Sequence, residues 1–190
     1  MAIGQGVQVT GNYSLGVGQD VIAGGDFSLA AGGSEADGEL STALGGSYAS
    51  NYGATAFGTS EADGLCSVAG GAAVASGNNS VAFGNTSNAS GPLTFAIGTA
   101  VNATGYYSMA LGYLTTSQVY RSTVVGSYNK LRGGSANTWV ATDDLFVIGN
   151  GSGYGTNAYS NAVVVRKDGA VLIHPTGDIS MGIFANGDQP

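Results

Sequence analysis

Asn78-Asn79-Ser80-Val81-Ala82-Phe83-Gly84 is the stretch that decides the fold, because versions of its core recur along two-thirds of the chain. The core is Ser-x-Ala-x-Gly at residues 80–84. Related pentapeptides begin at residues 14, 28, 41, 54, 67, 94, 108 and 122. The glycines that close this series, from Gly4 to Gly126, recur with a regular period of about 13–14 residues. Such a period predicts a solenoid, since each unit can bury its apolar side only against its neighbours.

Each repeat also carries a second short motif, in which a small residue is usually followed two positions later by glycine. Ala75-Ser-Gly77 and Ala89-Ser-Gly91 are examples. Two short strands per repeat, with glycine at the corners, predict a two-sided parallel coil. Stacked strands rise about 4.8 Å per coil, so about nine coils would make a rod on the order of 45 Å long.

Alternation along the main strand assigns its two faces. Ser, Ala and Gly share one face and stay small, so we place them inside a thin roll where two backbones approach closely. The predicted interior is Ser14, Ser28, Ala30, Ala43, Ala56, Ala69, Ser80, Ala82, Ala96 and Ala110. The positions between them are larger, mostly apolar, and would form a stripe on the outside. The main members of this stripe are Leu15, Val17, Leu29, Leu44, Phe57, Val68, Val81, Phe83, Phe95, Ile97, Met109, Leu111 and Val125.

An apolar stripe of this size is rarely left exposed to water. The simplest cover is the same stripe from other copies of the chain, which predicts self-association through these residues. The opposite assignment, with the large side chains inside and the small residues at an interface, is the alternative.

Charge is unevenly distributed along the 190 residues. The chain has 5 basic and 12 acidic residues. All the basic ones follow residue 120: Arg121, Lys130, Arg132, Arg166 and Lys167. An acidic solenoid repels phosphate backbones, which argues against nucleic acid as a partner. No apolar run approaches the roughly 18 residues of a membrane-spanning helix and no secretion signal is visible, so we expect no membrane insertion by this segment.

The rhythm breaks after Gly126, which divides the chain into a roll over residues 1–129 and a C-terminal β cap or foot over residues 130–190. Leu145–Gly149 reads as one more strand. Ala162–Arg166 and Ala170–His174 flank an Asp-Gly pair, which predicts a hairpin. Ile179–Phe184 is a candidate third strand. Solenoids need such atypical ends to stop end-to-end growth.

Residues that could carry chemistry are sparse, and we predict no catalysis, no cofactor and no metal site. His174 is the only histidine and Cys66 the only cysteine. The acidic corners 35–37 and 61–63 each offer two carboxylates on one strand face, too few oxygen ligands for a good calcium site. We interpret them as solvated corners.

Tyrosines gather late in the chain, at Tyr106, Tyr107, Tyr113, Tyr120 and Tyr128. We expect successive coils to bring several of them to one edge of the rod. There they are candidate ligand contacts, because exposed aromatics stack on sugar rings or anchor a protein partner. The alternative is that they cover the corners of the roll and a chain-to-chain seam.

The motif Asn-Ser-Val-Ala-Phe-Gly at 79–84, its relatives at 94–98 and 108–112, and the period of about 13–14 residues resemble the YadA-like head repeat of trimeric autotransporter adhesins. The resemblance covers residues 1–126. It implies a left-handed parallel β-roll in a side-by-side homotrimer. It also implies display on a bacterial cell surface and attachment to a host surface, a matrix protein or a glycan.

Similar repeats occur in phage tail fibres and spikes, which leaves alternatives open. One is a fibre segment on a virion tail that recognises a bacterial surface. Another is a structural spacer that holds a separate binding domain. No coiled-coil stalk or membrane-anchor barrel is visible, so we expect either a head fragment of a larger adhesin or part of a fibre.

Overall fold

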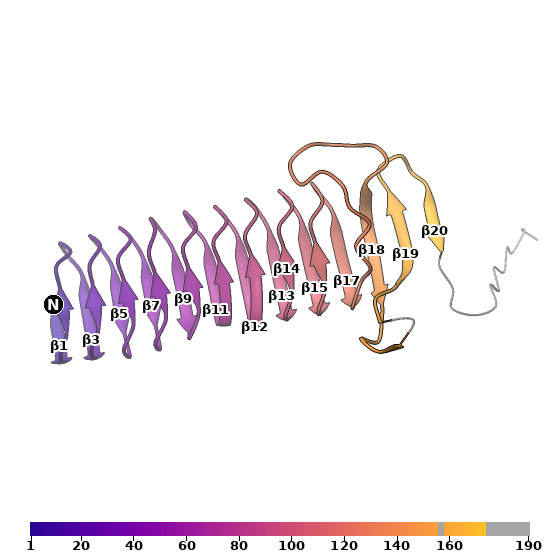
Figure 1. Ribbon diagram of the computed structural model, residues 1–190. Coiled ribbons are helices and arrows are strands. Elements are labelled where there is room, and N and C mark those ends of the chain that lie inside the picture. The colour runs from indigo at the N-terminus through magenta and orange to yellow at the C-terminus, as the bar shows by residue number, and fades with distance from the viewer. Residues whose placement is uncertain (156–157, 174–190) are drawn as a thin grey trace, which may run out of the picture.

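The computed structural model describes residues 1–155 and 158–173, which form a parallel β-solenoid of about nine turns followed by a short β extension (Figure 1). The predicted solenoid is therefore confirmed. Each turn contributes one main strand to a continuous parallel ladder. The main strands are β1 (Ala2–Gln5), β3 (Leu15–Gln19), β5 (Leu29–Ala31), β7 (Thr42–Leu44), β9 (Thr55–Gly58), β11 (Val68–Ala75), β12 (Val81–Ala89), β13 (Phe95–Thr99), β15 (Met109–Tyr113) and β17 (Thr123–Ser127).

A second ladder of two-residue strands forms the other side of the roll. Its members are β2 (Gln8–Val9), β4 (Ile22–Ala23), β6 (Glu35–Ala36), β8 (Tyr48–Ala49), β10 (Glu61–Ala62), β14 (Asn102–Ala103) and β16 (Thr116–Ser117). In two coils, β11 and β12 continue through the corner and supply both sides. The pairing is in register with the repeat, so Ala82 lies beside Ala69 and Ala96.

The interior of the roll is filled by small side chains. All ten predicted interior residues are buried, and the seven alanines among them are fully so. The larger residues of the main strand point outward instead, where none of the thirteen predicted stripe residues is buried. The structure thus has the small residues inside and the large ones outside. Two backbone ladders this close leave room for Ala and Ser but not for Leu or Phe.

Two corners connect the ladders, and only one of them varies in length. The first corner, which leads into the main strand, has the same length in every coil, as at residues 77–79. The second corner, which follows the closing glycine, has one residue fewer in the shorter coils. There a buried serine shortens the turn: Ser34 Oγ accepts the Ala31 N–H at 2.9 Å and donates to the Ala43 carbonyl at 2.7 Å. Ser47 and Ser60 repeat the arrangement.

The closing glycines are required by their left-handed conformation and, at most of these positions, also by lack of space. Gly98, for example, has a φ of +141°, which L side chains rarely adopt. A Cβ on it would lie 1.9 Å from the carbonyl oxygen of Gly112 in the next coil. The glycine column therefore sets how closely successive coils stack.

Beyond the last regular coil, β18 (Asp144–Asn150) adds another parallel strand to the main ladder, with Gly149 beside Gly126. It then pairs antiparallel with β19 (Asn161–Arg166), and β19 pairs antiparallel with β20 (Val171–Ile173). The predicted strand and hairpin are therefore present. Val124, Val147 and Val164 form a small core here. His174 and the candidate strand Ile179–Phe184 lie outside the described residues.

No helix among the described residues is long and apolar enough to cross a membrane.

Candidate attachment surfaces

The outer side of the main ladder is a long apolar face, which we call the main-strand face. Phe57, Phe83, Phe95 and Ile97 each leave 37–41% of their surface exposed, and the other predicted stripe residues are half-buried. Gly70 interrupts the stripe for a physical reason. A Cβ there would lie 2.3 Å from Cε1 of Phe83, so the Phe83 ring occupies the space above this glycine. The result is a nearly continuous layer of aliphatic and aromatic side chains.

The short-strand face is polar by contrast. Tyr48 lies between Glu35 and Glu61 on adjacent coils. Ser50 Oγ donates to Asp63 Oδ1 at 2.6 Å. Partial burial, followed by a hydrogen bond to Asp37, raises the pKa of Glu35. Repulsion by Asp63, followed by partial burial, raises the pKa of Glu61. The stretches 35–37 and 61–63 thus each contain two carboxylates that face each other.

These carboxylate pairs give little support for metal binding. No group of three or more His, Cys, Asp or Glu side chains that could hold a metal ion occurs within residues 1–155 and 158–173. The pairs 35/37 and 61/63 supply two carboxylates each and belong to coils separated by the Tyr48 strand.

The first corner has an unusual backbone. The residue immediately before the first residue of each pentapeptide has a left-handed backbone. At eight of these positions it is not glycine: one is Asn79, and seven are neither Gly nor Asn. The seven are Tyr13, Phe27, Leu40, Cys66, Leu93, Tyr107 and Arg121, with φ of 53–59°. Only Gly53 in this column is a glycine. A left-handed conformation costs a non-glycine residue roughly 1 kcal/mol or more. We call these nine positions the first-corner column.

Three of the five predicted tyrosines lie at one corner of the roll and the other two at the opposite corner. Tyr106, Tyr107 and Tyr120 lie at the first corner, where Tyr107 and Tyr120 meet edge to face at 5.7 Å and Arg121 lies over both rings. Tyr113 and Tyr128 lie at the second corner and meet edge to face at 5.3 Å, with Tyr159 beyond Tyr128. The main strand separates the two clusters, because Tyr107 precedes it and Tyr113 ends it.

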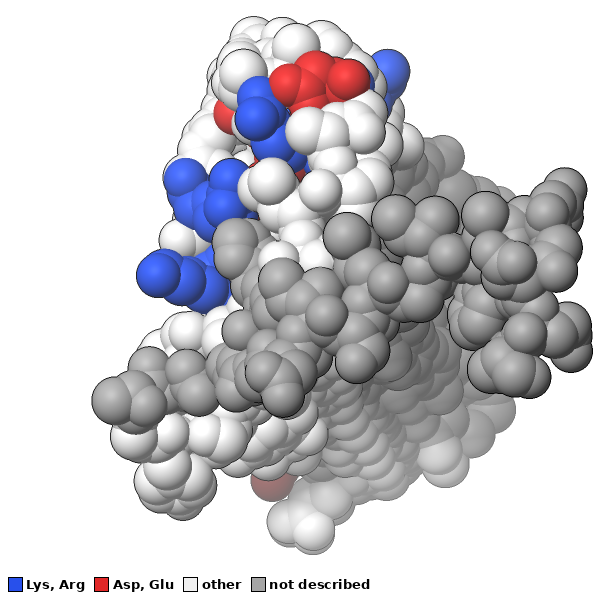
Figure 2. Space-filling view, turned by 90° about the vertical axis from the view of Figure 1, so that its right-hand side faces the viewer, with Lys and Arg blue, Asp and Glu red and all other residues white. Residues whose placement is uncertain are grey.

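Basic side chains lie around the end of the molecule that carries β18–β20, with acidic ones beside them (Figure 2). Most of them have partners: Arg132 Nε lies 3.2 Å from Asp144 Oδ1, and Arg166 pairs with Asp168 at 2.6 Å. Burial raises the pKa of Asp144, while Arg132 beside it acts in the opposite direction. These pairs leave little free positive charge at this end for a polyanion.

The segment between β17 and β18 folds back over the last coils (Figure 1). We call residues 131–143 the strap. The N–H groups of Tyr106 and Tyr120 donate to the carbonyls of Ala136 and Ser135, each at 2.8 Å. The strap is therefore hydrogen-bonded to the first corner of two successive coils.

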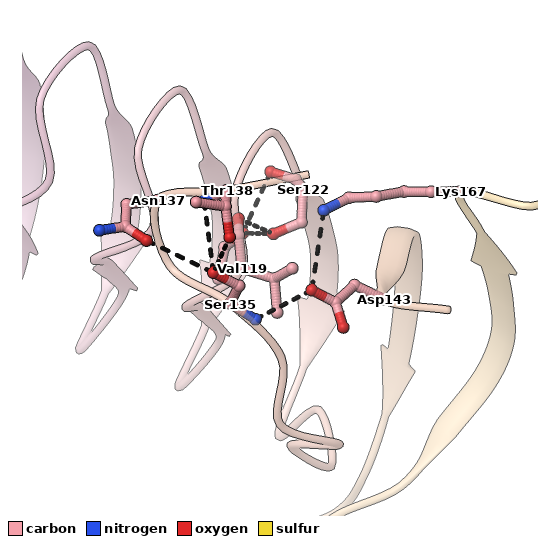
Figure 3. A network of polar contacts seen from close by, with 8 residues as sticks. Val119, Ser122, Ser135, Asn137, Thr138, Asp143 and Lys167 are labelled. Carbon is pink, nitrogen blue, oxygen red and sulfur yellow. Dashed lines mark hydrogen bonds and ion pairs between the residues drawn. The ribbon is translucent and has the colours of Figure 1, made fainter. Parts of the chain in front are cut away.

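Lys167, which follows β19, contacts the strap through its side chain (Figure 3). Its side chain is fully buried, and its Nζ lies 3.9 Å from Asp143 Oδ2, which accepts the Ser135 N–H at 2.9 Å. The ammonium also lies 5.1 Å from the centre of the Trp139 ring. Burial lowers the pKa of Lys167, and Asp143 opposes that shift. No sequence pattern indicates this arrangement, because backbone carbonyls make the main contacts of the strap.

Enclosed space is scarce in the described part of the molecule. A cavity of about 20 Å³ lies between the last coil and β18, beside Val119, Arg132 and Asp144. It has room for about one water molecule. An open depression beside Leu114, Lys130 and Tyr159 is the larger hollow.

The repeats match a known family. The model of the YadA head domain repeat matches four overlapping stretches, at residues 67–87, 75–100, 89–115 and 103–129. No curated protein matches the chain. Domains of this kind are adhesin-type structural domains at cell surfaces and are typically non-enzymatic. The same strand ladder and register continue through the coils before residue 67. Residues 67–129 are thus YadA-like head repeats of the kind found in trimeric autotransporter adhesins.

Proposed function

We propose that the chain is the non-catalytic head of a trimeric adhesin, which attaches a cell to a host surface, a matrix protein or a glycan. The observation that carries the proposal is the exposed main-strand face on repeats of the YadA head type. A face with Phe83, Phe95 and Ile97 side by side is rarely left in water, so it requires a cover. Two further copies of the same face supply that cover, in a ring closed by three-fold symmetry.

The proposed interface consists of the stripe predicted from the sequence. Its members are Leu15, Val17, Leu29, Leu44, Phe57, Val68, Val81, Phe83, Phe95, Ile97, Met109, Leu111 and Val125. The polar short-strand face, with Glu35, Tyr48 and Glu61, would then remain in water. The C-terminal strands β18, β19 and β20 would act as the cap that ends the roll.

The surfaces left outside the trimer would bind the target. A thin roll filled with alanine offers no deep pocket, so contacts would be shallow and repeated on three copies. Three weak contacts on one rigid body gain strength through multivalency. The candidate contacts are the two tyrosine clusters, Tyr106, Tyr107 and Tyr120 at the first corner and Tyr113 and Tyr128 at the second. Exposed aromatics of this type stack on sugar rings or anchor protein partners.

The first test is the solution mass of the purified chain by light scattering. A trimer would have three times the mass of the single chain, which is 18.7 kDa. A stable monomer of 18.7 kDa would contradict the proposed assembly. The trimer would then be immobilised and screened against glycans and matrix proteins, with a Tyr113→Ala/Tyr128→Ala variant beside the wild type. A trimer that binds no surface would instead be a spacer within a longer fibre.

A further inference from the structure

The first-corner column keeps bulky side chains where the backbone does not favour them. Its residues have φ between 53° and 63°, a range that glycine and asparagine adopt most readily. Only Gly53 and Asn79 are of these types. Tyr13, Phe27 and Leu40 in the first coils instead place large apolar groups on strained backbone. Left-handed residues other than glycine also occur at the second corner, at Asp20, Thr86 and Ala100 among others, so what distinguishes the first corner is the large apolar side chains on this backbone.

Contacts within the chain do not account for these side chains. Tyr13 leaves 88% of its surface exposed, and Leu40 and Leu93 each leave 46%. Tyr13 stacks on Phe27 at 5.3 Å, but the aliphatic members project into water. A glycine or asparagine would relieve the backbone and remove exposed apolar surface at the same time. The side chains therefore have a purpose outside the single chain.

The strap indicates that the partner of this edge is a polypeptide. Where the chain has a segment within reach, at the coils of Tyr106 and Tyr120, that segment covers the first corner through backbone hydrogen bonds. The coil before them has Pro92 at the equivalent position, which has no N–H to donate. The strap's hydrogen bonds to this corner end there. In the preceding coils the corner side chains of Leu40, Cys66 and Leu93 are exposed.

Ring symmetry identifies which polypeptide this is. A ring of three copies is held by heterologous contacts, in which two different strips of each copy meet. The main-strand face is one such strip. The first-corner column borders it directly, since Leu93 lies two residues before Phe95 along the chain. The short-strand face is polar and the second corner is built largely from Gly, Ser, Thr and Asn, so the first corner is the remaining apolar strip.

We propose that the first-corner column from Tyr13 to Leu93, in the coils that the strap does not cover, is one side of the seam between neighbouring copies and packs against the main-strand face of the next copy. The proposal rests on the trimer of the proposed function. On each copy the column borders the side of the face that carries Phe95. The side that carries Phe83 and Ile97 is therefore the one that receives the neighbour's Leu40 and Leu93. Strained backbone is kept in the protomer because its side chains are buried only in the assembly.

The test exploits opposite effects on the protomer and on the assembly. In the variant Leu40→Asn/Leu93→Asn, asparagine suits the left-handed backbone better than leucine does. The protomer fold should therefore be unharmed, as judged by circular dichroism. The seam loses two apolar side chains per copy, so the concentration at which the trimer half-dissociates should rise at least tenfold. That concentration is measured by light scattering over a dilution series in a fixed, moderate concentration of guanidinium.

The control places asparagine on the short-strand face, which the proposal leaves in water. Val74 is half-buried there, and its neighbours in the next two coils are Asn88 and Asn102, so the position accepts asparagine. Val74→Asn should leave the dissociation concentration within about twofold of the wild type. If Leu40→Asn/Leu93→Asn leaves the trimer as stable as wild type, or if the control weakens it equally, the seam is not at the first corner. The trimer itself would stand in either case. A wild-type monomer would instead overturn the proposed function and the seam together.

Cys66 offers a second readout without any substitution at the seam. It is the one cysteine of the sequence, belongs to the column and is exposed in the single chain. A maleimide should modify it at least tenfold more slowly in the trimer than after dissociation, with the modification followed by intact mass. Equal rates in the two states would contradict the burial of this column.

Discussion

On the inner face of the main strand, Ala82 and Ala96 are fully buried, whereas Phe83 and Ile97 on the outer face each leave more than a third of their surface exposed. Both faces come from one five-residue motif. The inner face is limited by the opposite ladder of the same chain, so its residues are uniformly small. The outer face has no such limit within the chain, and its residues vary from Gly70 to Phe83. Uniform size therefore marks packing inside the chain, and the large apolar residues on the other face are the ones we propose to pack between chains.

The largest expected effect comes from overfilling the inner face. Ala82→Leu adds three carbon atoms where two backbone ladders leave space only for a methyl group, and overpacking of this kind costs about 3 kcal/mol or more. We expect the variant to fail to fold, or its melting temperature to fall by roughly 6–12 °C. Thermal melts by circular dichroism measure this. Ala72→Leu is the control, because Ala72 is exposed at the second corner. An unchanged melt for Ala82→Leu would contradict the thin interior.

The next effect comes from placing a charge on the outer face. Phe83→Asp should abolish the trimer, because a carboxylate buried between chains without a partner costs several kcal/mol. Light scattering should then give the monomer mass at concentrations where the wild type is a trimer. Asn85→Asp introduces the same group two residues later on an exposed corner and should leave the trimer intact. If Phe83→Asp remains a trimer with an unchanged melting temperature, the interface lies elsewhere.

The comparison of faces also explains how much the sequence could predict. The alternation in Ser80-Val81-Ala82-Phe83 determines which side chains point inward, since a strand has only two faces. The strand at 145–149 could be predicted because it repeats the apolar pattern and closing glycine of the motif, although Gly149 follows Gly126 much later than the period of the roll requires. The local sequence pattern was therefore sufficient to predict strands and their faces wherever one repeat stacks on the next.

The corners were harder, for two physical reasons. Tyr107 and Tyr113 are close in sequence, but one precedes the main strand and the other ends it, so the strand separates them. The expectation that several tyrosines share one edge therefore did not say which of them lie at which corner. The strap could not be predicted because Ser135 and Ala136 act through backbone carbonyls, which every residue has. Left-handed backbone at Leu40 or Leu93 likewise has no signature in a leucine.

A smaller effect is expected on the polar face, where pH is the variable. The pKa of Glu61 is raised in the folded chain, chiefly by Asp63, above its usual value of 4.5. The protonated form therefore favours folding, and that contribution is present below pH 4.5 and is lost as the pH rises through the raised pKa. Glu61→Gln removes the repulsion, so its melting temperature should exceed that of the wild type at about pH 7 and match it near pH 4.

Melts over this pH range at constant salt and protein concentration measure the effect. It should be small, because Glu61 is exposed and its charge is screened. Glu39→Gln is the control: it makes the same charge change at an exposed corner without a carboxylate two residues later. If Glu61→Gln lowers the melting temperature at neutral pH, the carboxylates at this corner do not repel each other in solution.

The smallest expected effect lies within the inner face, between serines in the same position of the motif. Ser14 Oγ donates to the Gly25 carbonyl at 2.7 Å and accepts the Ser28 N–H at 3.0 Å, whereas Ser80 Oγ is buried without a hydrogen-bond partner in the described part of the chain. A buried hydroxyl without a partner loses its bonds to water and gains none in return. Ser80→Ala should therefore raise the free energy of unfolding by roughly 0.5 kcal/mol, and Ser14→Ala should lower it by about 1 kcal/mol. Chemical denaturation of the two variants at equal protein concentration measures the difference, and equal losses in both would mean that Ser80 finds a partner in solution.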